Sequence, residues 1–394
     1  MQVSQRIANM KESSIRKLVP LAEEAKKEGI KVYHLNIGQP DIPTPESFFA
    51  GVRNFKETVL SYSPTPGIPE LLQVFSDYYK RQNIELSPQE MLVTNGGSEA
   101  LLFAFMVLCD PGDEIMVPEP FYASYDLIAN ATNVKLIPVP TTSEGGFHLP
   151  GKEEFVKRIT PKTRAMIFSN PGNPTGTVYN REEMEMVADI AVENNLCIIA
   201  DEVYREFVYD GEHHSFLQIA RIKDRVMLVD SISKRFSACG ARIGSLSCKN
   251  PDLMKQIYKV AQTRLAVAAI EQAGAIALAE TPAEYFRDVK EEYRRRRDVT
   301  VAGLQDIPGV KCPKPEGAFY MLAELPVEDA EEFSAWLLRE FRYEGATVML
   351  APGNGFYVTP GGGKREVRIA YILNEDELKK ALVLLKKALA VYNK

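Results

Sequence analysis

The chain has 394 residues, 45% of them hydrophobic and 25% charged, and its formal net charge at pH 7 is -6. This composition is that of a folded globular protein, and the length predicts one large domain with a smaller one. The negative charge argues against a nucleic-acid-binding protein, and the sequence holds no stretch of about 18 uncharged apolar residues that could span a membrane.

The first predicted elements are a helix over residues 3–29, interrupted near Pro20, and a short strand over 32–37. A second helix is predicted over 68–82, and beyond it short apolar runs alternate with amphipathic ones. The strands predicted there are 91–94, 114–117, 135–139, 165–168, 196–200, 226–229 and 244–247, and the helices between them are 99–109, 124–131 and 181–194. Strands that alternate with helices predict an α/β fold with a mostly parallel sheet flanked by helices.

The pattern changes after Pro251, where long helices are predicted from 252 to 304 with a break at residues 281–282. The later predicted elements are strands 317–323, 347–350 and 367–372 and helices 328–342 and 375–392, an α+β texture. The sequence therefore predicts a large domain over residues 46–280 and a small domain over 281–394. Residues 1–45 are predicted to form an N-terminal segment that packs with the small domain.

The cysteines and histidines point away from disulfides and metals. The five cysteines are scattered without a CxxC pair, which fits free thiols in a reducing compartment. The four histidines lack the spacing of metal ligands, so no metal site is predicted. Because the N-terminus also lacks an apolar signal core, the sequence is interpreted as that of a soluble cytoplasmic protein. The basic run at residues 294–297 is flanked by acidic residues, which predicts a solvated or salt-bridged helix face.

One lysine, Lys234, follows the predicted strand 226–229 among small and hydroxyl residues. A lysine in such a pocket can lose its proton and attack a carbonyl to form an imine. Nearby Ser231 and Arg242 can hold a phosphate dianion. Together these residues indicate a lysine that carries a phosphorylated aldehyde, pyridoxal 5'-phosphate (PLP), whereas an ordinary surface lysine is the alternative.

Several predicted parallel strands end in polar residues, and such ends meet at one edge of a sheet, where ligands bind. Gly97 and Ser98 begin a predicted helix, whose free N–H groups and dipole suit a phosphate, although a plain helix cap is the alternative. Asp201 ends a buried strand and needs a partner there. A pyridinium nitrogen is a suitable partner for this carboxylate, because the carboxylate would keep the nitrogen protonated. The alternative is that Asp201 caps a helix or pairs with an arginine.

Three further residues are candidates for contacts with the ring. Tyr204 and Asn173 could hydrogen-bond the phenolic oxygen of the cofactor. The alternatives are that Tyr204 is an ordinary core tyrosine and that Asn173 only belongs to a tight turn. Tyr122 could stack on the pyridine ring or simply pack in the core. In the C-terminal part, Arg368 lies in an alternating strand pattern and could form a fork–fork pair with an α-carboxylate, with an internal salt bridge as the alternative.

The motifs at residues 38–41, 170–176, 201–204 and 231–244, together with Arg368, resemble the class I/II aminotransferases. This is the aspartate aminotransferase-like branch of the fold-type I PLP enzymes, and the resemblance runs nearly end to end. It implies a large PLP-binding domain, a small domain, and an obligate homodimer with shared active sites.

The resemblance also implies residue roles. Lys234 would be the Schiff-base lysine, with Asp201 on the pyridine nitrogen and Tyr122 against the ring. The phosphate would be bound by Ser98, Ser231 and Arg242, and the phenolic oxygen by Asn173 and Tyr204. Gly38 and Arg368, with Asn173, would meet the substrate, and Tyr62 looks like the tyrosine that reaches the phosphate of the neighbouring subunit.

The sequence departs from the family pattern at two positions. Many members have tryptophan where this chain has Ala241, and some aspartate-specific members have lysine where it has Ser98. A partner for a distal carboxylate must then lie elsewhere. Arg264, which lies in a stretch of small and apolar residues, is the candidate partner of a distal substrate carboxylate. The alternative is that Arg264 lies on the surface of a helix.

The expected function is transfer of an amino group from an L-amino acid, with aspartate expected, to a 2-oxo acid, with 2-oxoglutarate expected. The mechanism would be ping-pong, with Lys234 moving the α-proton. An alanine or aromatic aminotransferase, or a PLP-dependent β-lyase on the same scaffold, is the alternative. A PLP-binding transcription regulator is disfavoured, because the pattern begins near residue 30 and leaves no room for a DNA-binding domain.

Overall fold

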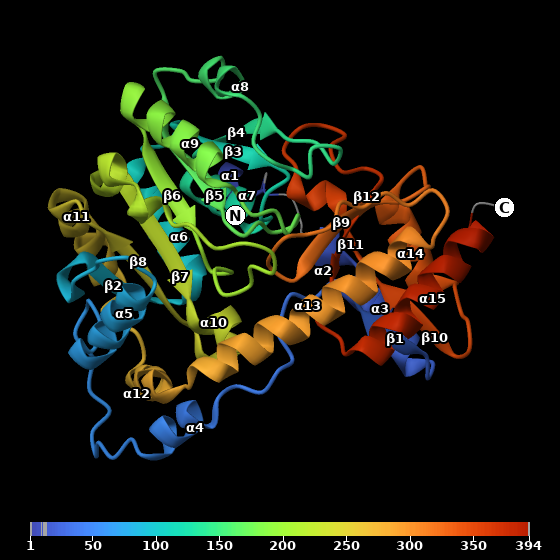
Figure 1. Ribbon diagram of the computed structural model, residues 1–394, viewed down its shortest axis with the longest axis horizontal. Coiled ribbons are helices and arrows are strands. Elements are labelled where there is room, and N and C mark those ends of the chain that lie inside the picture. Colours follow the sequence, from blue (N-terminus) through green and yellow to red (C-terminus); the bar gives the residue numbers. More distant parts are fainter. Residues whose placement is uncertain (1, 9, 11–13, 393–394) are drawn as a thin grey trace.

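The computed structural model describes residues 2–8, 10 and 14–392, which form a larger and a smaller part (Figure 1). The larger part holds a seven-stranded sheet, and the smaller part holds a three-stranded and a two-stranded sheet. The long helix α13 (Ala283–Gln305) runs from one part to the other. Within the described ranges, no helix combines the length and apolar character that a bilayer crossing requires.

The seven-stranded sheet confirms the predicted α/β fold. Its strand order is β2-β8-β7-β6-β5-β3-β4, where β8 is antiparallel to both neighbours and the other pairs are parallel. All seven predicted strands are present, with ends that shift by no more than two residues. They are β2 (Met91–Asn95), β3 (Glu114–Glu119), β4 (Lys135–Pro140), β5 (Thr163–Ser169), β6 (Cys197–Asp201), β7 (Val226–Ser231) and β8 (Ile243–Cys248).

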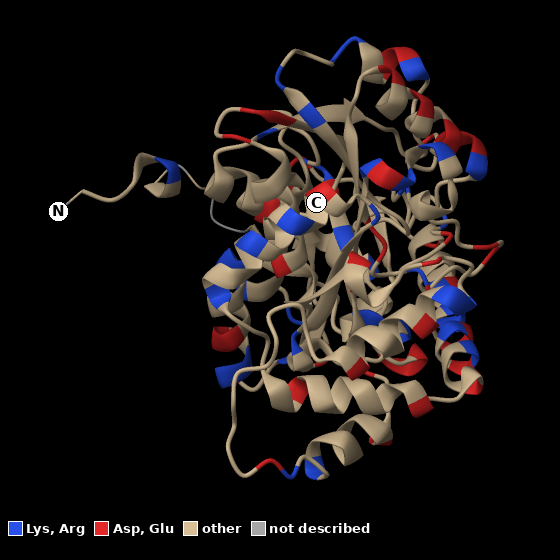
Figure 2. Cartoon of the chain, turned by 90° about the vertical axis from the view of Figure 1, so that its left-hand side faces the viewer, with Lys and Arg blue, Asp and Glu red and all other residues tan. Residues whose placement is uncertain are grey.

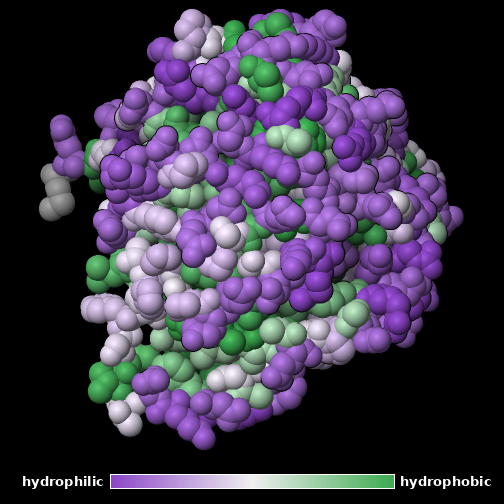
Figure 3. Space-filling model, turned by 60° about the vertical axis from the view of Figure 1, so that its left-hand side comes forward, coloured by the Kyte–Doolittle hydropathy of each residue, from purple (hydrophilic) through white to green (hydrophobic). Residues whose placement is uncertain are grey.

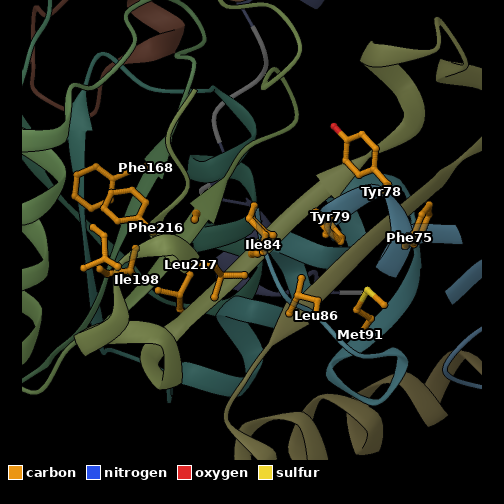
Figure 4. Close-up of a cluster of buried hydrophobic side chains, with 14 of the residues drawn as sticks. Phe75, Tyr78, Tyr79, Ile84, Leu86, Met91, Phe168, Ile198, Phe216 and Leu217 are labelled. Carbon is orange, nitrogen blue, oxygen red and sulfur yellow. The ribbon is translucent and has the colours of Figure 1, made fainter. Parts of the chain in front are cut away.

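Apolar side chains cover both faces of this sheet, because successive residues of a strand point to opposite sides. In β6, Ile198 joins a cluster with α5 (Pro69–Arg81) and α9 (Arg181–Glu193), which Figure 4 shows. The next residue, Ile199, joins a second cluster with α6 (Gly96–Leu108), α7 (Ser124–Thr132) and α11 (Pro251–Ala261). The continuous apolar runs of the sequence therefore correspond to strands that are buried on both faces.

The smaller part combines C-terminal elements with the N-terminal segment. Strands β11 (Ala351–Pro352), β12 (Glu366–Ala370) and β9 (Tyr320–Glu324) form an antiparallel sheet, with α14 (Ala330–Arg339) and α15 (Glu375–Tyr392) beside it. Strand β1 (Lys31–His34) pairs in parallel with β10 (Ala346–Met349). Strand β1 of the N-terminal segment thus lies against the C-terminal part, whereas helix α1 of the same segment contacts α7 of the larger part. The domain boundaries at residues 45 and 280 stay predictions.

Some predicted helices were wrong in extent. In place of one N-terminal helix there are α1 (Gln5–Ala8), α2 (Ser14–Lys17) and α3 (Val19–Lys27), and residues 9 and 11–13 lie outside the described ranges. Pro20 lies in the first turn of α3, which begins at Val19, and it does not interrupt the helix because the first turn needs no N–H donor. The helical region after residue 251 breaks between α11 and α12 (Ala269–Ala277), where Leu265 has a φ of 68°. Helices α4 (Glu46–Arg53) and α8 (Lys152–Val156) were not predicted.

The basic run at residues 294–297 lies in α13 and is salt-bridged, as predicted. Its first two arginines pair with Glu291 and Glu292 of the same helix. Its last two are buried and pair with Asp41 at 2.6 Å and Asp210 at 2.8 Å. Positive and negative residues are interspersed over the face drawn in Figure 2.

One titratable contact joins the two parts of the molecule. His148, in the loop after β4, lies 3.0 Å from Glu183 of α9 through Nδ1 and 3.4 Å from Glu316, near β9, through Nε2. Hydrogen bonds that the imidazole donates to Glu183 and Glu316 raise the pKa of His148 from 6.5 to about 10, against the effect of burial. The protonated imidazole therefore pairs with both carboxylates.

We expect this contact to make stability depend on pH. A histidine whose pKa rises on folding adds its full stabilisation below pH 6.5, and the contribution declines as pH rises towards about 10. The difference in melting temperature between wild type and His148→Gln should shrink from pH 6 to pH 10. His34→Gln is the control, because burial lowers the pKa of His34. A difference that stays constant or grows over this range would contradict the expectation.

Candidate active site

A cavity of about 500 Å³ lies at the carboxyl ends of the parallel strands, between the two parts of the molecule. Its walls come from the ends of β5, β6 and β7, from the start of α6, and from β9 and β12 of the smaller part. Of the residues predicted for the site, those that line it are Gly38, Gly97, Ser98, Tyr122, Asn173, Asp201, Tyr204, Ser231, Lys234, Arg242 and Arg368. The polar strand ends therefore meet at one edge of the sheet, as predicted.

Lys234 reaches the cavity from α10 (Ile232–Arg235), a single helical turn directly after β7. The Ser231 hydroxyl oxygen caps this turn by accepting from the Ser233 backbone N–H at 3.1 Å. The Lys234 Nζ donates to the Gly38 carbonyl oxygen at 2.8 Å. A Cβ at Gly38 would lie 1.9 Å from the Tyr320 hydroxyl, so the backbone at this position must be glycine to approach so closely. The amine is thus held at a defined place in the cavity.

Asp201 lies in the floor of the cavity at the end of β6 and is only 4% exposed. Its Oδ2 accepts from the Tyr125 hydroxyl at 2.8 Å, whereas its buried Oδ1 has no hydrogen-bond partner. Burial raises the pKa of Asp201 to about 6, and the hydrogen bond from Tyr125 opposes that rise. A buried carboxylate oxygen without a partner is costly unless a ligand supplies a donor or a cation.

One end of the cavity suits a phosphate. Gly97 and Ser98 begin the 13-residue helix α6, where free N–H groups and the helix dipole favour an anion. Arg242 lines the same end and donates to the Cys239 carbonyl oxygen at 3.0 Å. Arg242 has a φ of 52°, and such left-handed conformations of non-glycine residues concentrate at functional sites. A Cβ at Gly96 would lie 2.4 Å from its guanidinium, so glycine lets the two segments meet.

The wall that β12 contributes suits a carboxylate. Arg368, on β12, donates to the Asn173 Oδ1 at 3.1 Å and to the Asn36 carbonyl oxygen at 2.7 Å, and its buried Nε has no hydrogen-bond partner. In the described part of the chain no carboxylate forms an ion pair with Arg368, so the internal salt bridge is not found there. Its guanidinium lies 4.5 Å from the ring centre of Tyr320.

Tyr204 lines the same cavity. Its hydroxyl is 2.9 Å from the Tyr320 hydroxyl, and burial raises the pKa of Tyr204 well above its usual value. Tyr122 packs edge to face against Tyr125, with ring centres 5.5 Å apart. The cavity thus combines an anion-binding helix start, an unpaired buried carboxylate oxygen, a lysine amine and a buried guanidinium. A ligand with a phosphate, a protonated ring nitrogen and a carbonyl fits this set of groups.

Comparison with known proteins decides the family. The family model for aminotransferases of class I and II matches residues 30–385. The chain belongs to the class I and II aminotransferases. It is 31% identical to the aspartate aminotransferase of Bacillus subtilis, over 98% of each chain. The aspartate aminotransferase of Thermus thermophilus with maleate has a TM-score of 0.89 at 31% identity, over 98% of this chain and 100% of that one. The alanine aminotransferase of Pyrococcus furiosus has a TM-score of 0.91 at 31% identity, over 99% and 100%.

Two predicted site residues lie outside the cavity of this aminotransferase. The Tyr62 side chain is 83% exposed, in the irregular segment between α4 and α5. Arg264 forms an ion pair with Glu99 at 3.2 Å and donates to the Val93 carbonyl oxygen at 2.7 Å, and its side chain is only 14% exposed. Arg264 therefore joins the segment after α11 to α6 and β2 within the chain, and it is no exposed helix-surface arginine.

Sequence reasoning missed three residues at or behind the site of this aminotransferase, and two of them, Tyr320 and Arg16, line the cavity. Tyr125 is the hydrogen-bond partner of Asp201, and Tyr320 lies between Tyr204 and Gly38. Arg16, on α2, lines the same cavity as Arg368. Nothing in the sequence indicated contacts between Tyr125 and a residue 76 positions away, or between α2 and the site.

Proposed function

We propose that this aminotransferase binds PLP and transfers the amino group of L-aspartate to 2-oxoglutarate. The observation that carries the proposal is the buried Oδ1 of Asp201, which lacks a partner and belongs to the same cavity as the Lys234 amine. A protonated ring nitrogen is a suitable partner for that oxygen. When bound, PLP supplies an electron sink for the charge that develops at the substrate α-carbon.

Apart from Tyr62, the residues proposed to contact the cofactor line the cavity. The start of α6 and the segment after β7 would bind the phosphate, through Gly97, Ser98, Ser231 and Arg242. Asp201 would pair with the ring nitrogen, oriented by the hydrogen bond from Tyr125. The ring face and the phenolic oxygen would be contacted by Tyr122, Asn173 and Tyr204.

Lys234 is proposed to move the substrate proton. As a free amine, its Nζ would take the proton from the substrate α-carbon and return it one step later. The hydrogen bond to the Gly38 carbonyl oxygen supports this role, because it holds Nζ at one place. Arg368, Asn173 and Gly38 would bind the substrate α-carboxylate and so orient the α-carbon towards Nζ.

The aspartate preference is supported by relatives named as aspartate aminotransferases. An alanine aminotransferase is the second candidate, because the Pyrococcus furiosus enzyme of that name has an equally similar structure. Within one chain, Arg16 lines the cavity and Arg264 does not. Arg16 is therefore proposed as the partner of a distal carboxylate, and Arg264 keeps this role only if it reaches the site of a neighbouring subunit.

A screen of amino donors against 2-oxoglutarate tests the proposal. Aspartate should be preferred, and varying both substrates should give parallel initial-rate lines. Arg16→Gln should lower kcat/KM for aspartate roughly 10- to 100-fold, the value of a hydrogen bond to a charged group, and leave alanine unchanged. Arg264→Leu is the matched variant, and loss of aspartate preference there instead would assign the carboxylate to Arg264. Release of pyruvate and ammonia without a new amino acid would point to a β-lyase.

We also propose that the enzyme is a homodimer in which Tyr62 reaches the phosphate of the partner subunit. Support comes from the segment between α4 and α5, where Val59 is 70% and Leu60 62% exposed. On the mostly hydrophilic face drawn in Figure 3, hydrophobic atoms reach the surface at the lower left. Exposed apolar patches of this kind mark protein interfaces. A second copy is the proposed occupant, since the family resemblance places Tyr62 at a shared site. A monomeric mass in sedimentation equilibrium would contradict the dimer.

A cytoplasmic location is proposed from the thiols. All five cysteines are free in the structure. Free thiols persist in reducing compartments, whereas secreted proteins tend to form disulfides. Detection of the native protein outside the cytoplasm in cell fractionation would contradict this location.

A further inference from the structure

Four charged residues lie directly beside active-site residues in the chain but are absent from the lining of the cavity. Glu202 follows Asp201, Arg205 follows Tyr204, Asp230 precedes Ser231 and Arg235 follows Lys234. Their exposures are 0, 4, 0 and 3% in that order. Two acidic and two basic side chains are thus almost fully buried behind the site, a cluster called the charge network below.

The first pair of the network encloses the lysine turn. Arg235 Nη1 lies 2.5 Å from Asp230 Oδ2. Asp230 Oδ1 also accepts from the Ser231 backbone N–H at 2.7 Å, and its Oδ2 accepts from the Tyr79 hydroxyl at 3.0 Å. Asp230 therefore binds the start of the turn that carries Lys234 and, through Arg235, its end.

The second pair supports the strand end that carries Asp201. Arg205 Nη2 donates to Glu202 Oε2 at 2.9 Å. Glu202 Oε1 accepts from the Ser215 hydroxyl at 2.9 Å and from the Phe216 backbone N–H at 3.2 Å. The residues that flank Asp201 and Tyr204 are thereby fixed to a neighbouring loop.

Two aromatic residues of α5 connect the pairs. The Arg235 guanidinium lies 4.1 Å from the ring centre of Tyr78, and the Arg205 guanidinium lies 5.0 Å from that of Tyr79. Such contacts of a cation with an aromatic ring are favourable, and more so when water is excluded. The guanidiniums also hold the pKa of Asp230 below its usual value against the opposing effect of burial.

Stability alone does not explain the charge network. Buried ion pairs often add no more to the free energy of unfolding than apolar residues of similar volume, because desolvation offsets their attraction. They do restrict geometry, because each partner must lie within hydrogen-bond distance. The helical turn around Lys234 needs such restriction, since it has only four residues and one turn is not stable in isolation.

We propose that Glu202, Arg205, Asp230 and Arg235 are positioning residues that fix the Lys234 amine and the Asp201 carboxylate in the cavity. The inference rests on the proposed function only in that these two groups carry the chemistry. If the turn loosens, Nζ no longer lies where the substrate α-proton is presented. A displacement of about 1 Å can cost roughly 100-fold in rate.

The double variant Asp230→Asn/Arg235→Met tests the proposal, because it removes both charges of one pair and leaves no buried charge unpaired. We expect kcat to fall roughly 100-fold with little change in KM. The visible absorbance of the holoenzyme should titrate at a shifted pH, which a merely structural role would not produce. The single variant Arg235→Lys keeps the positive charge but loses the two-pronged guanidinium, and its kcat should lie between those of the double variant and the wild type.

A matched control is Asp210→Asn/Arg297→Met, which removes the 2.8 Å ion pair between the buried Arg297 of α13 and the exposed Asp210 of a loop. This control should lower the melting temperature and leave kcat and the absorbance titration unchanged. Wild-type kcat and titration in the Asp230→Asn/Arg235→Met holoenzyme would overturn the proposal, as would equal effects in the control. Borohydride labelling of wild type distinguishes failure of this inference from failure of the proposed function. If no label is found on Lys234, the proposed function itself is contradicted.

Discussion

Lys234→Ala is expected to abolish amino transfer almost completely. The change removes the amine that lines the cavity and donates to the Gly38 carbonyl oxygen. Loss of a positioned general acid–base alone lowers rates by about 10²- to 10⁴-fold, and loss of the covalent link to PLP adds to that. The measurement is twofold: initial rates with aspartate and 2-oxoglutarate, and peptide masses after borohydride treatment and digestion of the holoenzyme.

Lys234→Arg is the matched control for charge. It keeps a cation at the same place, but a guanidinium neither forms the link nor accepts a proton at neutral pH. Both variants should lack the pyridoxyl group that the wild-type peptide carries. The assignment would be wrong if the label mapped to another lysine in wild type, or if Lys234→Arg transferred amino groups at the wild-type rate.

The sequence predicted the large sheet well, because its signal is local. Most strands of this sheet are short apolar runs with a polar residue at the end, and burial on both faces produces that pattern. Asp201 and Lys234 could be placed together for the same reason, since parallel strand ends share one edge. The resemblance to the aminotransferases supplied roles that periodicity alone could not assign.

The contacts that escaped prediction all join distant segments. Tyr125 and Asp201 are 76 positions apart, and Arg264 and Glu99 are 165 apart. The small and apolar residues around Arg264 indicated that its guanidinium has a specific partner. They could not show which, because a carboxylate of the same chain and a carboxylate of a substrate bind a guanidinium equally well. The break before α12 was also missed, because the apolar residues around Leu265 continue the helical pattern while its backbone does not.

The cavity depends on both parts of the molecule. Lys234 and Asp201 come from the larger part, whereas Arg368 and Tyr320 come from the smaller one. The start of α13 packs against the core of the larger part through Phe286, and its later turns pack in the core of the smaller part. The relative placement of the two parts thus sets the distance between the lysine amine and the proposed carboxylate site.

Asp201→Asn is expected to weaken PLP binding and amino transfer together. Removing one partner of a buried charge pair costs about 2–5 kcal/mol, which corresponds to roughly 30- to 4000-fold in affinity. The amide also cannot keep a ring nitrogen protonated, so kcat should fall even when the cofactor is saturating. Equilibrium titration with PLP and initial rates at saturating PLP separate these two effects.

The pH dependence adds an independent check on Asp201. Its carboxyl has a pKa of about 6 in the ligand-free chain, and only the ionised form can pair with a ring cation. PLP affinity should therefore fall as pH drops below about 6 in wild type, and this part of the pH dependence should vanish in Asp201→Asn. Tyr125→Phe, which removes only the hydrogen bond to Oδ2, should cost less, about 1.5–3 kcal/mol. Equal PLP affinity in wild type and Asp201→Asn across this range would mean that the unpaired Oδ1 does not receive the ring nitrogen.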